Sequence, residues 1–154
     1  MIDNMKRKLI KAVALSAIAG CASAGPKGRS VNTVVLNYTD RYIADVVADG
    51  VWVGSANAHS GDGNRVQGLL APADPNRAAV LKLKWIVSGR LDFKTNRYVE
   101  LPIEEKSASV EVARPYPSDP SYLVIHFYPD GHVEAELEAD RPKRRIPPPA
   151  GYPR

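Results

Sequence analysis

Apolar and polar residues alternate along several short stretches of the chain. In the clearest case, Ala79–Val87, every second side chain is large and apolar, while Lys82 and Lys84 lie on the opposite face. A period of two predicts a strand with one buried face in an antiparallel sheet. Further stretches rich in β-branched or alternating residues predict strands of the same kind: Val31–Tyr38, Ile43–Ala48, Val51–Ala56 and Ser107–Arg114.

The dipeptide Asp49-Gly50 predicts a hairpin between two of these strands. Asp and Gly both tolerate the positive φ that a two-residue hairpin turn requires. Such a turn would place Val47 opposite Trp52 and Val46 opposite Val53. A second, less clear hairpin is expected about Thr95-Asn96, and the glycine-rich stretch 57–68 predicts a loop.

A third hairpin is expected in Tyr122–Ala139, about the turn Pro129-Asp130-Gly131. Its register places His126 opposite Glu134. The inward face would hold Leu123, Ile125, Phe127, Val133, Ala135 and Leu137. The outward, solvated face would hold Tyr122, Val124, His126, Tyr128, His132, Glu134, Glu136 and Glu138.

These elements together predict an all-β fold. After residue 20 no segment shows a helical period over ten or more residues. About seven short strands separated by turns are typical of an antiparallel β-sandwich, immunoglobulin-like in architecture.

The first 20 residues predict a signal peptide. Four basic residues between Lys6 and Lys11 precede a short apolar run that ends in Ile18-Ala19-Gly20-Cys21. This ending resembles the bacterial lipobox, in which the cysteine is lipidated and becomes the first mature residue. Ala22-Ser23-Ala24 also fits ordinary cleavage, which would release a soluble protein instead. The apolar run is too short to span a bilayer.

Four segments follow from this interpretation. Residues 1–20 form the lipoprotein signal peptide, 21–30 a flexible tether, 31–140 the β-sandwich domain and 141–154 a basic, proline-rich tail. The residue after Cys21 is Ala22 rather than Asp, which favours the periplasmic face of the outer membrane; a soluble periplasmic protein is the alternative.

Removal of the signal peptide lowers the net charge of the remaining chain. The whole chain has a formal net charge of +4, but four basic residues and one acidic residue leave with residues 1–20, so the remainder is nearly neutral. This balance argues against nucleic acid as a partner. Cys21 is the only cysteine, so neither an intramolecular disulfide nor a cysteine-based zinc site can form.

Two groups of residues suggest chemistry at first sight. His59, Ser60 and Asp62 are close in sequence, but the Gly-x-Ser-x-Gly elbow of many hydrolases is absent, so a surface or binding loop is favoured and no catalytic residue is predicted. His126, His132 and Glu134 would share one face of the third hairpin. An ordinary His-Glu pair on a solvated face is favoured over a metal site there. We expect no metal and no cofactor.

Aromatic and charged residues concentrate where the first strand ends. Tyr and Arg are the residue types that carry interface energy, so a binding edge is one interpretation, and a structural Tyr beside an Arg-Asp pair is the other. The candidate partner-binding residues are Tyr38, Asp40, Arg41, Tyr42, Trp52, His59, Asp62, Tyr128 and Asp130. The basic tail, Arg141–Arg145, is a candidate for contact with anionic headgroups.

Three stretches carry a resemblance to a known family. Asn37–Ile43, the glycine-rich loop Gly54–Gly63 and His126–Gly131 resemble an uncharacterised proteobacterial lipoprotein family, and the resemblance covers about Val31 to Ala139. Members are often encoded beside type VI secretion lipase effectors. The resemblance therefore implies an immunity protein that binds and sterically blocks a phospholipase in the periplasm, without catalysis of its own. The alternatives are a structural envelope lipoprotein with no toxin partner and a small periplasmic hydrolase.

Overall fold

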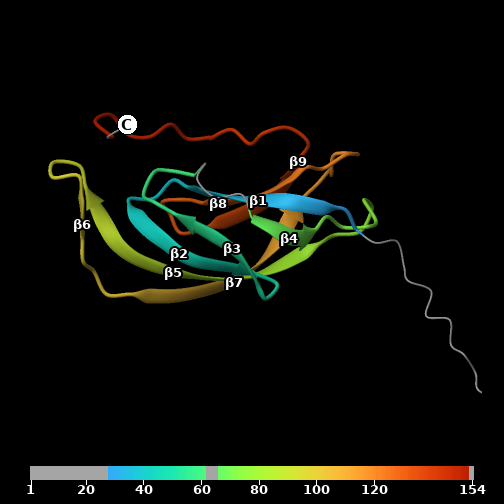
Figure 1. Cartoon of the computed structure of the whole chain (residues 1–154), viewed down its shortest axis with the longest axis horizontal. Coiled ribbons are helices and arrows are strands. Elements are labelled where there is room, and N and C mark those ends of the chain that lie inside the picture. The colour runs from blue at the N-terminus through green and yellow to red at the C-terminus, as the bar shows by residue number, and fades with distance from the viewer. Residues whose placement is uncertain (1–27, 62–65, 153–154) are drawn as a thin grey trace, which may run out of the picture.

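The computed structural model describes residues 28–61 and 66–152, and this part of the chain is built from strands (Figure 1). It forms nine: β1 Ser30–Asn37, β2 Arg41–Ala48, β3 Val51–Ala56, β4 Val66–Leu70, β5 Val80–Asp92, β6 Arg97–Val99, β7 Glu104–Ala113, β8 Tyr122–Phe127 and β9 Val133–Glu138. The predicted all-β class is confirmed. Within the same residues there is no helix that could cross a membrane.

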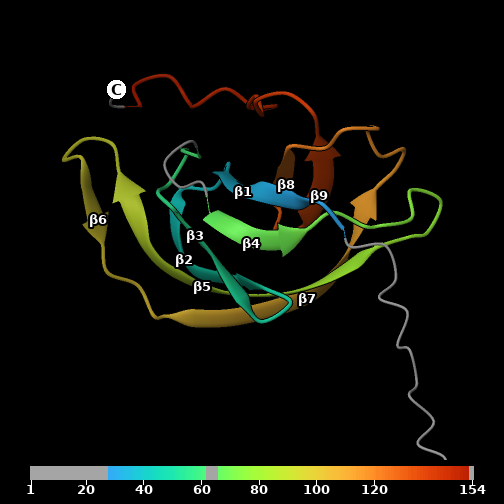
Figure 2. The same cartoon turned by 45° about the vertical axis from the view of Figure 1, so that its right-hand side comes forward.

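The described strands form one curved sheet. Their order is β3-β2-β5-β7-β9-β8-β1-β4, with β6 added beside β5. Figure 2 shows β5 and β7 curving round so that they face β1 and β4. The two ends of the order, β3 and β4, are in contact, so the sheet is nearly a barrel. The architecture therefore lies between a sandwich and a closed barrel.

The expectation of a purely antiparallel sheet is wrong at two junctions. β1 runs parallel to β8, and β7 runs parallel to β9. Parallel neighbours require a long crossover between them. Here the segments that intervene are themselves strands of the same sheet, and local alternation carries no signal of such long-range pairing.

The hairpin between β2 and β3 forms at the predicted turn. Asp49 and Gly50 have φ of 48° and 82°, and Val47 pairs with Trp52 as expected. The predicted pairing of Val46 with Val53 is wrong, because Val46 pairs with Gly54. The register shifts beside Val46 mark a bulge, which adds a residue to one strand and cannot be read from alternation.

β4 corrects the prediction of a loop over 57–68. Val66–Leu70 pairs antiparallel with β1, and its one glycine, Gly68, does not prevent this because the edge of β1 supplies hydrogen-bonding partners. Gly68 has φ of 146°, and a Cβ there would lie 3.2 Å from Val51. The hairpin about Thr95-Asn96 is confirmed by the pairing of Asp92 with Arg97.

The β8–β9 hairpin has the predicted register throughout, including His126 opposite Glu134. Gly131, in the turn, has φ of 91°. The inward residues of both strands, from Leu123 to Leu137, belong to the main core.

The outward face of β8 is not solvated, contrary to the prediction. Val124 and His126 are 0% exposed, and a second apolar cluster formed by Val34, Leu36, Tyr38 and Val124 lies on this side of the sheet. The cover is the C-terminal tail, which runs across β8 and β9 (Figures 1 and 2). In the described residues 141–152 it forms no strand, as predicted.

Candidate functional site

Asn37 shapes the turn that joins β1 to β2. Its side-chain amide donates to the carbonyls of Arg41, at 2.7 Å, and Asn57, at 2.9 Å, and more weakly to that of Ala56. Its Oδ1 accepts the backbone N–H and the hydroxyl of Thr39. Because Asn37 is completely buried, these bonds fix the turn and the adjacent loop as one unit.

Arg41 projects from this turn toward a cavity at the end of the sheet. Its Nε donates to the carbonyl of Ser88 at 2.5 Å, and its Nη1 pairs with Glu104 at 3.3 Å. Nη2 is buried without a hydrogen-bond partner among the described residues. The guanidinium is therefore held from one side and faces the cavity with the other.

The cavity, which we call the mouth, has a volume of about 570 Å3. Its apolar lining includes Ile43, Trp85, Val87, Leu101 and Phe127. Its polar lining includes Tyr38, Asp40, Arg41, His59, Arg90, Glu104, Lys106, Tyr128 and His132. A concave site with an apolar floor and convergent polar groups is the usual form of a binding site.

Tyr38 and Tyr128 join the mouth to the outer face through a stack of rings. Tyr128 stacks on His132 at 4.2 Å between ring centroids, and Tyr38 packs against both His126 and Tyr128. The carboxylate of Glu136 can only accept, so Nε2–H of His126 donates to it at 2.9 Å. In the neutral ring Nδ1 is then an acceptor, and the hydroxyl of Tyr38 donates to it at 2.9 Å while it accepts the backbone N–H of Arg145.

The tail neutralises the acidic side of this stack. Arg145 makes ion pairs with Glu134 and, at 2.6 Å, with Glu136, and it donates to the hydroxyl of Tyr128 at 2.8 Å. Arg144 lies over the ring of Tyr38 at 5.0 Å. Burial lowers the pKa of His126, the positive charge of Arg145 lowers it further, and the bond to Glu136 opposes both.

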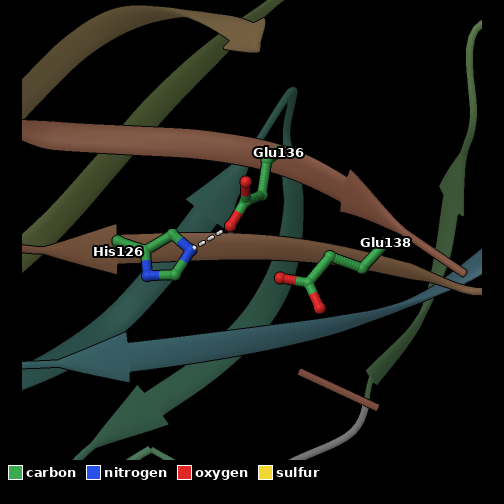
Figure 3. A group of neighbouring side chains, drawn as sticks. All are labelled: His126, Glu136 and Glu138. Carbon is green, nitrogen blue, oxygen red and sulfur yellow. Dashed lines mark hydrogen bonds and ion pairs between the residues drawn. The ribbon is translucent and has the colours of Figure 1, made fainter. Parts of the chain in front are cut away.

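His126, Glu136 and Glu138 place one ligand atom each within 4.8 Å of one another. Figure 3 shows the ring of His126 and the carboxylate of Glu136 joined by a hydrogen bond, with the carboxylate of Glu138 beside them. Burial and the neighbouring Glu136 raise the pKa of Glu138. Since Arg145 already supplies a cation at Glu136, we assign no metal site to this group.

The structure brings five of the nine candidate residues together in the mouth: Tyr38, Asp40, Arg41, His59 and Tyr128. Asp130 lies at the nearby turn and pairs with His132 at 2.5 Å. Trp52, on β3, is 47% exposed and does not line the mouth. Asp62 and Cys21 lie outside the described residues.

His59 and Ser60 are not arranged as a catalytic pair. The hydroxyl of Ser60 donates to the carbonyl of Asn57 at 3.1 Å. The ring of His59 packs instead against Phe93 and Tyr152, with centroids 5.4 and 5.9 Å away. Burial lowers the pKa of His59, and the charge of Asp40 opposes that effect.

A group of exposed or half-buried apolar side chains lies beside the mouth, and Tyr42 is the member of it that was a candidate from the sequence. Tyr42 meets Tyr98 edge-on at 6.0 Å, and together they line a second cavity of about 650 Å3 with Leu101 and Ile103. We call Tyr42, Phe93, Tyr98, Val99 and Ile103 the wing patch. Its signal in the sequence is weak because residues 92–103 do not alternate cleanly.

The wing patch is fixed to the loop behind the mouth. The hydroxyl of Tyr98 accepts the backbone N–H of Ala58 at 2.8 Å, and Tyr152 of the tail donates to the carbonyl of the same residue at 2.9 Å. Partial burial raises the pKa of Tyr98. These bonds hold two distant segments against the loop.

The fold and this site define an all-β protein with an aromatic and charged mouth at one end of a nearly closed sheet. The chain belongs to the DUF3304 family, proteins of unknown function, whose model matches residues 36–135. No curated protein and no solved structure matches it. The match runs from the end of β1 into β9 and stops before the tail.

Proposed function

We propose that the protein is a membrane-tethered periplasmic binding protein, and specifically an immunity protein that binds and blocks a type VI secretion phospholipase. The wing patch is the observation that carries the binding role. Ile103 is 69% exposed, and Phe93, Tyr98 and Val99 are each at least 36% exposed. Tyr98 and Ile103 line the second cavity together with Tyr42 and Leu101, and exposed apolar side chains that gather in this way are typical of protein interfaces.

The surroundings of the patch suit a partner protein. The mouth beside it offers Arg41, Arg90 and Asp40 as polar groups around an apolar floor. Interfaces commonly combine an aromatic and apolar centre with a polar rim that includes arginine. This combination supports protein recognition more than recognition of a small polar molecule.

Rigidity supports inhibition by occlusion. Asn37 fixes the turn below the mouth, and Tyr98 fixes the β5–β6 hairpin to the loop behind it. A surface that is ordered before binding loses less conformational entropy when a partner docks. The protein would cover the entrance of the lipase active site, and no catalytic group of its own is needed. The identity of the partner rests on the resemblance to lipoproteins encoded beside lipase effectors.

The experiment is binding and protection with variants of the patch. A phospholipase encoded beside the gene is purified, its affinity for the full protein is measured by calorimetry, and survival is scored when the lipase is directed to the periplasm. We expect Ile103→Glu and Val99→Glu to weaken binding by about tenfold or more, because each buries a charge at the interface.

Leu70→Glu is the matched control. Leu70 is 62% exposed on β4 and does not line the mouth or the second cavity, so this variant should bind and protect like the wild type. If the wild-type protein neither binds the lipase nor protects cells from it, the immunity role is wrong. A structural envelope lipoprotein would then be the better interpretation.

A further inference from the structure

One edge of β7 is left open over most of its length. β7 pairs with β5 from Glu104 to Glu111, but it pairs with β9 only at Val112 and Ala113. Between residues 104 and 111 its other edge has no ladder partner in the part of the chain that the structure describes. We call the opening between residues 104–111 and residues 131–135 the β7–β9 seam.

The hydrogen bonds of the sheet show which backbone groups point into the seam. The N–H of Val112 donates to the carbonyl of Ala79 on the β5 side, at 2.8 Å. In an antiparallel pair successive residues point alternately to the two sides, so Val110 and Ala108 also bond to β5. Ser107 and Ser109 therefore direct their N–H and C=O groups into the seam.

β9 presents the same kind of edge from the other side. The N–H of Tyr128 donates to the carbonyl of His132, so Glu134, two residues further on, also bonds to β8. Val133 then directs its N–H and C=O toward β7. Between these two edges lies an open cavity of about 760 Å3.

The size and lining of the cavity suit one extended strand. With a rise of about 3.3 Å, a strand spacing of about 4.8 Å and a layer thickness of about 10 Å, a strand residue occupies about 160 Å3, so the cavity has room for about five residues. The floor is apolar, with Trp85, Ala108, Val110 and Val133. The middle of the β7 edge, from Ser107 to Val110, carries only small or apolar side chains, and the charged residues Lys106 and Glu111 flank it.

We propose that the β7–β9 seam accepts one extended segment of a partner polypeptide, which adds as a strand to β7. Backbone groups of Ser107 and Ser109 would provide affinity, and the apolar floor would select small apolar side chains at every second position. A second copy of the chain fits less well, because its own β7 edge lies in the same recess. The proposal extends the binding role proposed above. It depends on that role only for the statement that the partner is a polypeptide.

The test uses peptides rather than the lipase, so it can fail independently of the immunity role. A phage library of random 12-residue peptides is selected on the purified full-length protein, and the enriched peptides are measured against two variants. Ser107→Pro removes an N–H that points into the seam and leaves the β5 ladder intact, whereas Ser107→Ala changes only the side chain. We expect about tenfold weaker binding to Ser107→Pro and nearly unchanged binding to Ser107→Ala.

Amide hydrogen exchange provides a second measurement that does not depend on the folding of a variant. The amides of Ser107, Ser109 and Val133 should exchange rapidly in the free protein and slowly when an enriched peptide is added. Failure to enrich any peptide, or equal binding to Ser107→Pro, would overturn the proposal. Slow exchange of these amides in the free protein would also overturn it, because the chain itself would then cover the edge. Protection that grows with protein concentration would overturn it as well and would assign the edge to a dimer interface.

Discussion

Asn37 connects its own turn, at Thr39 and Arg41, to residues 56 and 57, which lie 19 and 20 residues further along the chain. Its amide donates to the carbonyls of Arg41 and Asn57, which also accept hydrogen bonds from the side chains of Thr39 and Ser60. Asn37 is uncharged and directly precedes the aromatic and charged residues 38–42. The side chains that line the mouth are therefore positioned by a residue that does not itself line it.

Asn37→Ala should destabilise the protein by about 2–4 kcal/mol, because a completely buried side chain that makes five hydrogen bonds is lost. Urea denaturation measures the change. Asn32→Ala is the control, since Asn32 makes a single long bond, 3.5 Å, to the carbonyl of Ser121 and should cost less than about 1 kcal/mol. Equal losses for the two variants would contradict the role assigned to Asn37.

His126 should make stability depend on pH. Its pKa in the folded protein lies below the ordinary value of 6.5, so the unfolded chain binds more protons as the pH falls below 6.5. The contribution of neutral His126 is complete above that pH and is lost as the pH falls toward the folded pKa, by at most about 1.4 kcal/mol per pH unit.

Denaturation between pH 8 and pH 5 measures this effect. His126→Gln should be less stable at pH 8, since the bonds to Tyr38 and Glu136 are disturbed, but its stability should fall less on acidification. His132→Gln, which replaces the half-exposed histidine of the same hairpin, is the matched control variant. A wild-type curve that is flat from pH 8 to pH 5 would rule out a buried neutral His126.

At the scale of elements, the tail changes the character of a whole sheet face. Without it, Leu36 and Val124 would lie on the surface of β1 and β8. Residues 141–152 cover them in an extended conformation, held by Arg145 at one end and Tyr152 at the other. Polar residues alternate along β9 because their carboxylates face the basic tail, as well as water. Contact of the tail with anionic headgroups stays a prediction, to which Lys143 is free to contribute as an exposed cation.

Arg145→Ala should weaken this attachment. The side chain is 41% exposed, so solvent screens its ion pairs with Glu134 and Glu136, and we expect a loss of about 1 kcal/mol that shrinks in high salt. Denaturation at low and high salt measures it. Lys143→Ala should change stability by less than about 0.5 kcal/mol. A salt-independent loss in Arg145→Ala would mean that its charge is not what holds the tail.

At the scale of the whole molecule, the sheet is closed almost completely, and the surfaces proposed for binding lie where closure is incomplete. The mouth, the wing patch and the β7–β9 seam all border the region where β5 and β7 extend beyond their neighbours. Lys106 and His132 line both the mouth and the seam. A partner that occupies the mouth would therefore also lie close to the open edge of β7.

Tethering through Cys21 remains a prediction about the whole molecule, because residues 1–27 lie outside the described part. Metabolic labelling with a radioactive fatty acid should mark the wild-type protein and not Cys21→Ala. A linked lipid keeps the protein at the membrane surface where a phospholipase acts, which raises its local concentration there. If the wild type carries no label, the protein is a soluble secreted one and the tethering mechanism is wrong.

Much of the fold could be predicted from local pattern. The turns Asp49-Gly50 and Pro129-Asp130-Gly131 specify their own backbone angles, and alternation specifies which face of β5 or β8 points inward. β4 could not be predicted, because this short segment follows a glycine-rich loop, does not alternate and becomes a strand only when the edge of β1 lies beside it. The bulge beside Val46 was missed because an extra residue in one strand leaves no signal in the alternation.

By itself the sequence determined the all-β class, the hairpins and their inward faces, since these follow from side-chain period and turn chemistry within about ten residues of chain. It also placed Tyr38, Asp40 and Arg41 at one strand end. The tertiary structure alone decided that the tail buries Val124 and His126, that β7 runs beside β9 over two residues only, and that Tyr98 and Ile103 are exposed near Arg41. These features depend on contacts between segments far apart in the chain, and only the closure of the sheet brings such segments together.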